Sequence, residues 1–163
     1  MKRVIPFILY LLLIAAHQVI LRDITAVYTA NINLTALMVL TVAVYKPELV
    51  AAWFGFAAGL VLAAGSPDLL GWHALWLTGL GTVAFHAREK LNLDSLYARL
   101  LLVVSGVMVH NLLVLITSFR TVDFWYSLVT AALPGAVYTT LIAWLFFLFK
   151  EGHITWAKVR ALF

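Results

Sequence analysis

The sequence predicts an all-α polytopic membrane protein with six transmembrane helices. Hydrophobic residues fill 64% of its 163 positions, and the mean hydropathy of +1.03 lies far above that of ordinary soluble proteins. Charged residues make up only 11%, under half of their usual share. The apolar residues fall into six stretches, each bounded by charged or turn-forming residues. The connections are short, which predicts one membrane domain without a soluble insertion.

The six expected spans make up a membrane domain over residues 1–149. They cover residues 4–21, 27–45, 49–64, 72–87, 97–119 and 124–149. The third and fourth contain 16 residues each, fewer than the roughly 20 that cross a bilayer squarely. Either the bilayer is thinner there, or part of the glycine-bracketed turn at residues 65–71 enters the apolar layer.

Both ends of the chain carry basic residues next to apolar ones. Lys2 and Arg3 precede the first apolar run as in a signal peptide, but the run is long and lacks an A-x-A end. We therefore expect it to remain as an uncleaved span. Residues 150–163 form a short basic cytoplasmic tail, in which Trp156 and Phe163 would share one helical face. The tail is either a short amphipathic helix on the inner leaflet or a plain solvated segment.

The distribution of Lys and Arg predicts the orientation. With six spans, both termini lie on the same side of the membrane, and nine of the eleven basic residues fall on that side. Only Arg22 and Arg120 fall on the other. Because cytoplasmic loops carry an excess of basic residues, both termini are expected in the cytoplasm. The basic residues stand singly between apolar runs, so topology explains the net charge of +4 better than nucleic-acid binding does.

Small residues recur at every fourth position of the third span, and two of them form a GxxxG pattern. They are Ala51, Gly55, Gly59 and Ala63. On a helix this spacing gives a flat stripe, against which a neighbouring backbone can pack closely in lipid. We interpret the stripe as a helix-packing or partner face, and the short connection favours the fourth span over a separate single-span partner. The alternative is that small residues are merely scattered in an alanine-rich chain.

Most of the unusual polar residues fall in the outer half of the expected membrane domain. They are His17, Gln18, Asn31, Asn33, Asp68, His73, His110 and Asn111. Their shared depth predicts an outward-facing pocket or a partner-docking surface. The alternative is a set of hydrogen bonds between helices, worth about 0.6–2 kcal/mol each.

The sixth span contains Pro134-Gly135 near its middle, and this pair is expected to kink the helix. Tyr138, Thr139 and Thr140 follow and could satisfy the carbonyl groups that a proline leaves without a donor. The alternative is a tolerated bend that has no functional role.

The sequence carries no pattern of a catalytic or cofactor site. It contains no cysteine, which excludes a disulfide framework, a thiolate metal site and a cysteine nucleophile. All seven acidic residues lie in loops or at span ends, whereas proton-coupled carriers usually hold a carboxylate inside the membrane. There is no H-E-x-x-H helix and no P-loop, and the histidines are scattered. Neither enzymatic activity nor a metal or other cofactor is expected.

Three motifs follow one another between residues 33 and 87. They are Asn33-Leu34 near the start of the second span, Gly55-Phe56-Ala57-Ala58-Gly59-Leu60 in the third, and the turn Gly65-Ser66-Pro67 leading to Leu70-Gly71-Trp72-His73-Ala74-Leu75. Their order, together with the length and span number of the whole chain, resembles the MreD family of bacterial rod shape-determining proteins. Two positions depart from the family pattern. Ile32 stands where a proline is common, and Ala63 stands where an ungapped comparison places a frequent aspartate.

The resemblance implies a non-catalytic scaffold subunit of the cell-elongation machinery in the bacterial inner (cytoplasmic) membrane. It implies the single-span protein MreC as main partner, with the glycosyltransferase RodA, its transpeptidase and the actin-like MreB nearby. It also implies a six-helix fold similar to the substrate-binding (S) subunits of energy-coupling-factor transporters. A second hypothesis is therefore a small-molecule-binding subunit of a vitamin transporter, because the outer polar residues could surround a pocket.

Overall fold

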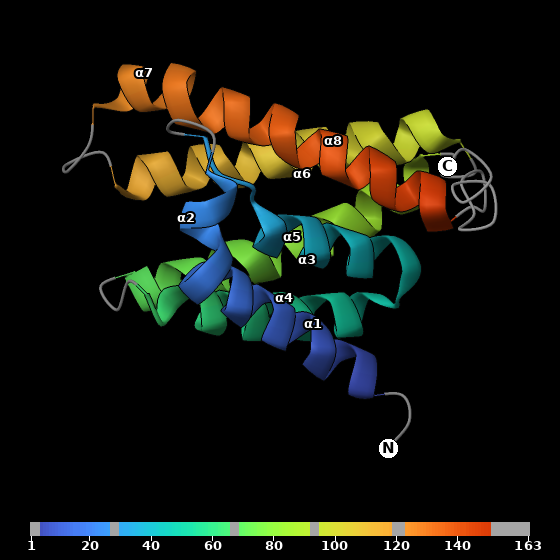
Figure 1. Ribbon diagram of the computed structural model, residues 1–163. Helices are drawn as coiled ribbons and strands as arrows, with labels where there is room; N and C mark the ends of the chain where they lie inside the picture. Colours follow the sequence, from blue (N-terminus) through green and yellow to red (C-terminus); the bar gives the residue numbers. More distant parts are fainter. Residues whose placement is uncertain (1–3, 27–29, 66–68, 92–94, 119–122, 151–163) are drawn as a thin grey trace, which may run out of the picture.

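The computed structural model describes residues 4–26, 30–65, 69–91, 95–118 and 123–150, and the regular elements in these ranges are all helical. The elements are α1 (Ile5–Ala16), η1 (His17–Leu21, a π-helical turn), α2 (Arg22–Thr25), α3 (Leu34–Tyr45), α4 (Glu48–Ala63), α5 (Leu70–Lys90), α6 (Leu96–Thr117), α7 (Phe124–Ser127), η3 (Leu128–Ala132, a second π-helical turn) and α8 (Leu133–Lys150). Successive helical segments alternate in direction and pack into one bundle (Figure 1).

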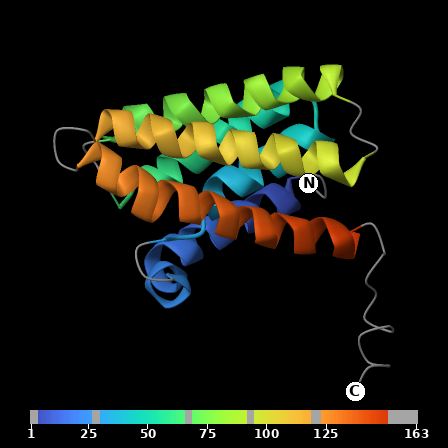
Figure 2. The ribbon, with the colours of Figure 1, turned by 90° about the horizontal axis from the view of Figure 1, so that it is seen from above.

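The centre of the bundle is α3. Nine of its twelve residues are buried, and it packs against α1, α4, α5, α6 and α8. Its sequence is apolar on all sides, which is typical of a helix surrounded by others. Figure 1 shows α3 between the layer of α6 and α8 and the layer of α1 and α4, and Figure 2 shows α5, α6 and α8 side by side.

Two helices in the described ranges are long and apolar enough to cross a membrane. They are Leu96–Thr117, which is α6, and Phe124–Lys150, which joins α7, η3 and α8. Only 22% and 33% of their most apolar windows are buried in the bundle, so most of their apolar side chains face outward. A core helix of a soluble protein would bury such a window, and the outward apolar surface indicates a membrane protein.

The second helical segment begins later than the sequence analysis expected. The predicted span 27–45 is helical only from Leu34, because residues 30–33 are not helical and residues 27–29 lie outside the described ranges. Asn33 caps the helix, and its backbone N–H donates to Thr139 Oγ1 at 2.9 Å instead of joining a helical turn. The boundary therefore coincides with a local cap and a long-range contact at the same residue, and apolar periodicity did not reveal it.

The fourth helical segment is longer than expected. The predicted span 72–87 becomes the 21-residue α5, which extends through Lys90. Nη1 of Arg88 donates to the carbonyl oxygens of Ala43, Val44 and Lys46 at 2.9–3.1 Å, where α3 ends. These contacts hold the last turn of α5 against the rest of the bundle, so α5 is not a short helix. The third segment, α4, has 16 residues.

The irregularity in the last segment precedes the proline. A π-helical turn covers Leu128–Ala132 and continues directly into α8 at Leu133, so Pro134 follows the irregular turn within one continuous helical segment. Gly135 serves a close approach, because a Cβ there would lie 2.9 Å from the carbonyl oxygen of Asn31. The tail that we expected beyond Lys150, with its amphipathic helix, lies outside the described residues.

Candidate functional site

The small-residue stripe of α4 lies against α5. All of its members are buried: Ala51, Gly55, Gly59 and Ala63. A Cβ added at Gly59 would lie 2.6 Å from the carbonyl oxygen of His73, and one added at Gly55 would collide with the carbonyl oxygen of Leu77. Because these neighbours are backbone atoms, they cannot rotate away. We call this close contact the α4–α5 seam.

The seam includes a glycine of α5 as well. A Cβ added at Gly81 would lie 2.7 Å from the carbonyl oxygen of Ala51. In contrast, Gly79 on the same helix has no atom within 4 Å of an added Cβ. The close approach is therefore a property of one face of each helix, and glycine content alone does not produce it.

A cavity of about 680 Å³ adjoins the seam, at the end of the bundle where α4 and α6 end and α5 begins. Seven of the eight polar residues that the sequence analysis grouped together line it: His17, Gln18, Asn31, Asn33, His73, His110 and Asn111. The eighth, Asp68, lies outside the described residues. The volume falls within the roughly 300–1,000 Å³ that is typical of small-molecule sites.

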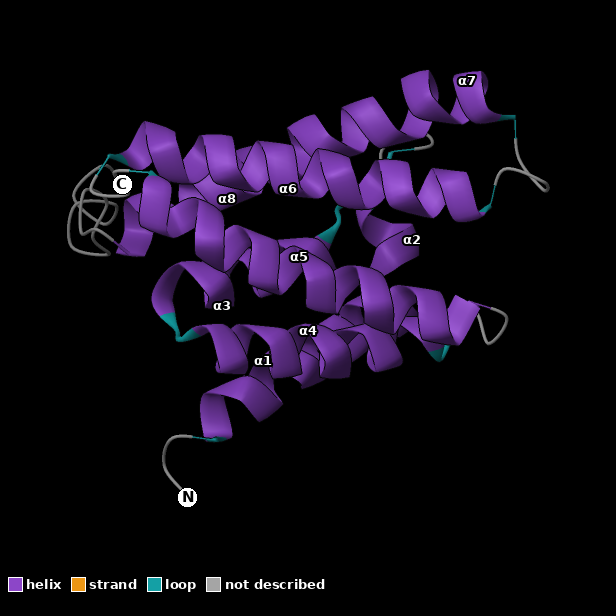
Figure 3. Cartoon of the chain, turned by 180° about the vertical axis from the view of Figure 1, so that it is seen from behind, coloured by secondary structure: helices purple, strands orange, loops and turns teal. Residues whose placement is uncertain are grey.

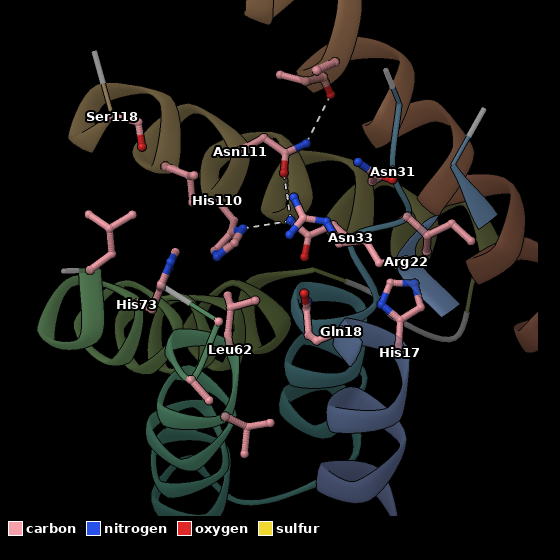
Figure 4. Close-up of a pocket in the computed structure, with 18 of the residues that line it drawn as sticks. His17, Gln18, Arg22, Asn31, Asn33, Leu62, His73, His110, Asn111 and Ser118 are labelled. Atoms are coloured by element: carbon pink, nitrogen blue, oxygen red, sulfur yellow. Dashed lines mark hydrogen bonds between the residues drawn. The ribbon is translucent and has the colours of Figure 1, made fainter. Parts of the chain in front are cut away.

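Asn33 joins three elements at the wall of the cavity. Its Oδ1 accepts a hydrogen bond from the backbone N–H of Ala36 at 3.0 Å, which caps α3. Its Nδ2 donates to Asn111 Oδ1 at 2.7 Å and lies 2.8 Å from His110 Nδ1 (Figure 4). Asn111 in turn donates from Nδ2 to the carbonyl oxygen of Ala132 at 3.1 Å. Side chains thus tie the start of α3 to α6 and to η3.

This network assigns the tautomer of His110. Because Asn33 uses Oδ1 for the cap, the atom that it turns to His110 is an amide nitrogen, which only donates. Nδ1 of His110 is therefore the acceptor, and the proton of the neutral ring lies on Nε2. His110 is only 3% exposed, and Nε2 has no hydrogen-bond partner among the described residues. A buried N–H without an acceptor is destabilising, so His110 presents an unused donor.

Four other buried polar atoms around the cavity also have no hydrogen-bond partner among the described residues. They are both ring nitrogens of His17, Nδ1 of His73 and Oδ1 of Asn31. His17 and His73 are 4% and 7% exposed. Figure 4 shows the rings of His73 and His110 turned toward the same space. Gln18 differs, because its Nε2 donates to Thr35 Oγ1 at 3.5 Å.

The sequence analysis did not assign three further polar residues of the cavity wall, Arg22, Ser118 and Ser127. Arg22 is the only lining residue, of those described, that carries a formal charge. The sequence could have singled out Arg22, because it is one of only two basic residues that the predicted topology places on the outer side of the membrane. The serines gave no signal, because single serines are common in membrane helices.

Both π-helical turns of the described chain border the cavity. η1 supplies His17, Gln18 and Val19, and η3 supplies Ala131 and Ala132. A π-helical turn contains one more residue than an α-helical turn, so it rotates the side chains that follow, and such turns are frequent at functional sites. The pattern of a regular 3.6-residue helix does not reveal them.

In the part of the chain that the structure describes, His, Asp and Glu side chains form no group of three that could hold a metal ion. The fold and the cavity define a helical membrane protein with a polar cavity at one end of its bundle. No family model, no curated protein and no solved structure matches the chain. A proposal about function must therefore rest on its own residues.

Proposed function

We propose that this protein is a non-catalytic scaffold subunit of the bacterial cell-elongation machinery, similar to MreD. One observation carries the proposal: the two longest motifs behind the resemblance touch each other. Gly55 and Gly59 of the third-span motif pack on the α5 backbone, and Gly59 meets His73 and Ala74 of the fourth-span motif. Two motifs that form one contact are a more specific pattern than two separate apolar strings, because each limits the residues that the other tolerates.

The proposal includes six spans in the bacterial inner membrane with both termini in the cytoplasm. The start of α1 and the end of α8 lie toward the same side of the bundle (Figure 3), which fits an even number of spans. Basic residues gather at this end. Arg88 donates to the carbonyl oxygen of Lys46, and Nζ of Lys150 lies 3.0 Å from the centre of the Tyr45 ring. The positive-inside rule then supports a cytoplasmic location for this end.

Reporter domains test this topology. A reporter fused after Phe163 is expected to be cytoplasmic, and one inserted within residues 65–71 is expected to be external. A cytoplasmic signal from the second insertion would overturn the six-span arrangement.

A scaffold also needs surface for its partners. Large apolar side chains are exposed along several helices, for example Leu12 on α1, Leu101 on α6 and Leu141 on α8, each more than half exposed. Such surface fits both lipid and an apolar helix of another protein. In the proposal, MreC is the main partner, and RodA, its transpeptidase and MreB lie nearby.

The decisive experiment is co-purification with MreC from the same bacterium. Both proteins are expressed together, extracted in mild detergent and captured through a tag on MreC. Recovery in a near-constant ratio is expected, whereas an unrelated single-span protein with the same tag should recover none. Depletion in the cell is expected to convert rods into rounded cells. Absence of both results would refute the scaffold function.

The cavity favours a second candidate, a small-molecule-binding subunit of a vitamin transporter. Its volume and its mixture of apolar and hydrogen-bonding residues are those of a ligand site. Such a subunit would support saturable vitamin uptake in proteoliposomes when its energising module is added, whereas a scaffold would not. This measurement separates the two candidates.

A further inference from the structure

We propose that the cavity binds a small amphipathic ligand through an oxyanion, a phosphate or carboxylate group that accepts hydrogen bonds from His110 and pairs with Arg22. This inference goes beyond the scaffold proposal and does not depend on it, because it concerns what fills the cavity and not which protein binds the exterior.

The first argument is the unused donor of His110. The hydrogen bond from Asn33 occupies Nδ1 and leaves the N–H on Nε2, with no acceptor among the described residues. His73 adds a nearly buried ring whose Nδ1 also lacks a described partner. An ionised oxygen is the strongest acceptor for the His110 N–H, and it can also accept from His73 in the tautomer that carries its proton on Nδ1.

The second argument is the charge of the wall. Arg22 brings one positive charge, and no carboxylate stands among the lining residues that the structure describes. Gln18, Asn31 and Asn111 add amide groups around it. Among the described lining residues a cation would find no opposite charge, whereas an anion would find Arg22 together with several hydrogen-bonding groups.

The third argument concerns the rest of the ligand. About half of the wall is apolar, including Val19, Val61, Leu62, Leu69, Val114 and Leu115. A cavity of about 680 Å³ is far larger than a bare phosphate needs. The ligand therefore carries an apolar part beside its oxyanion. A phospholipid headgroup with its first acyl carbons and a soluble organic phosphate or acid both have this chemistry.

The test uses the full-length protein in an uncharged detergent and measures melting temperature against probe concentration, because a ligand that binds only the folded protein raises it. Hexyl phosphate represents the soluble source, and dihexanoyl phosphatidylglycerol represents the lipid. Hexanol is the matched probe without the oxyanion. We expect both phosphates to raise the melting temperature saturably and hexanol to leave it unchanged.

Two variants assign the effect to the cavity. Arg22→Gln and His110→Phe are each expected to weaken phosphate binding about tenfold or more, which is typical for loss of a hydrogen bond to a charged group. His110→Gln, which keeps an amide donor in place of the ring N–H, is expected to restore part of the affinity. Lys90→Gln and His86→Phe are matched controls at the opposite end of α5 and should bind as the unchanged protein does. Because Arg22 is exposed and lies outside the Asn33 network, Arg22→Gln remains a valid test even if His110→Phe does not fold.

The outcomes distinguish a lipid headgroup from a soluble ligand, and they also test the proposal itself. Stronger binding of dihexanoyl phosphatidylglycerol than of hexyl phosphate assigns the site to a lipid headgroup, and the reverse assigns it to a soluble ligand. The proposal is overturned if neither phosphate binds, if hexanol binds equally well, or if Arg22→Gln retains full affinity. Loss of phosphate binding with intact MreC recovery would reject this inference and leave the scaffold function standing.

Discussion

The α4–α5 seam and the polar cavity adjoin each other, yet one brings two backbones into contact and the other keeps several helices apart. In the seam, Gly55 and Gly59 place no side-chain atom between the helices, so backbone atoms of α4 and α5 touch there. At the cavity, Asn33, His110 and Asn111 bridge the helices with hydrogen bonds around a volume of about 680 Å³. The comparison shows that small residues allow a short distance between helices in the seam, whereas hydrogen bonds between polar side chains hold the helices at a larger distance around the cavity.

The two regions meet at His73. Its backbone carbonyl faces Gly59 across the seam, and its side chain lines the cavity. The α4–α5 seam therefore fixes the position of His73 in the wall of the cavity. In a membrane the helices gain little from the hydrophobic effect, so van der Waals contact, as in the seam, and hydrogen bonds, as at the cavity, both contribute to their association.

The largest effect is expected from filling the seam. Leucine at both Gly55 and Gly59 places two side chains where backbone atoms of α5 already lie, and overpacking costs about 1–3 kcal/mol at one such site. Two such sites together cost about 2–6 kcal/mol, which reaches the lower end of the roughly 5–15 kcal/mol by which folded proteins are stable. Loss of folded protein is expected, measured as a sharply lower melting temperature in detergent.

Gly79→Leu is the matched control for this change. It adds the same side chain to α5 where an added Cβ has open space, so the melting temperature should change little. Unchanged melting of the double variant, together with unchanged recovery of MreC, would show that the stripe does not set the packing of α4 on α5.

The next effect tests the polar network. Asn33→Leu removes the cap of α3, worth about 0.5–2 kcal/mol, and leaves acceptors on His110 and Asn111 without their amide donor, at about 1–3 kcal/mol each. Relaxation reduces the sum, so we expect a loss of about 2–4 kcal/mol in unfolding free energy. Asn33→Ser keeps an oxygen that can cap α3 and is too short to reach His110 and Asn111, so it should lose less than Asn33→Leu. Equal losses in the two variants would mean that the cap contributes nothing, and an undiminished unfolding free energy in the variant that keeps the cap would mean that the cavity network contributes nothing.

A smaller effect is expected at the end of α5 far from the cavity. Arg88→Met keeps most of the apolar stem but removes the three hydrogen bonds to the carbonyl groups at the end of α3. Because one partly exposed guanidinium makes all three, we expect a loss of about 1–2 kcal/mol, within the range for hydrogen bonds to charged groups. Hydrogen exchange should rise in the last turn of α5 and not at the cavity. Faster exchange at the cavity would show that the two ends are coupled.

The sequence revealed these two regions to different depths. Spacing alone singled out Ala51, Gly55, Gly59 and Ala63, because a helical stripe is a local property of one segment. Seven polar residues that now line one cavity were also visible, since polarity inside an apolar span is conspicuous. The sequence did not show whether these residues form a pocket, a docking surface or hydrogen bonds between helices, because that depends on helices that are distant in the chain.

Helix ends and irregular turns were the features that the sequence analysis missed. α3 begins at Leu34, where Asn33 caps it and also bonds to Thr139, more than a hundred residues away. The π-helical turns at His17–Leu21 and Leu128–Ala132 break the 3.6-residue period on which the boundaries were read. The Asn33 cap is a local signal that the apolar pattern overrode, because Asn is a preferred residue at the start of a helix. The sequence thus predicted the presence of the helices better than their ends and irregular turns.

The smallest effect is expected when the cavity is filled. Ala131 lines it from η3, and Ala131→Leu adds three carbon atoms, one fewer than each glycine-to-leucine change in the seam. In the cavity the new methyl groups gain contacts with atoms that previously faced empty space, which offsets the strain of a new rotamer. We therefore expect the unfolding free energy to change by less than about 1 kcal/mol, and a small gain is typical of cavity filling.

The same variant also distinguishes space that serves a ligand from space that is a packing defect. If the cavity holds a ligand, Ala131→Leu should leave melting nearly unchanged while hexyl phosphate binds at least several-fold more weakly, because the added side chain occupies part of its volume. If the cavity is only a packing defect, Ala131→Leu should be more stable than the unchanged protein, and hexyl phosphate should bind neither of them. A fall in melting temperature as large as that of the seam variants would contradict both descriptions. It would mean that the helices around Ala131 are already in contact, so that the seam and the cavity differ in polarity but not in packing.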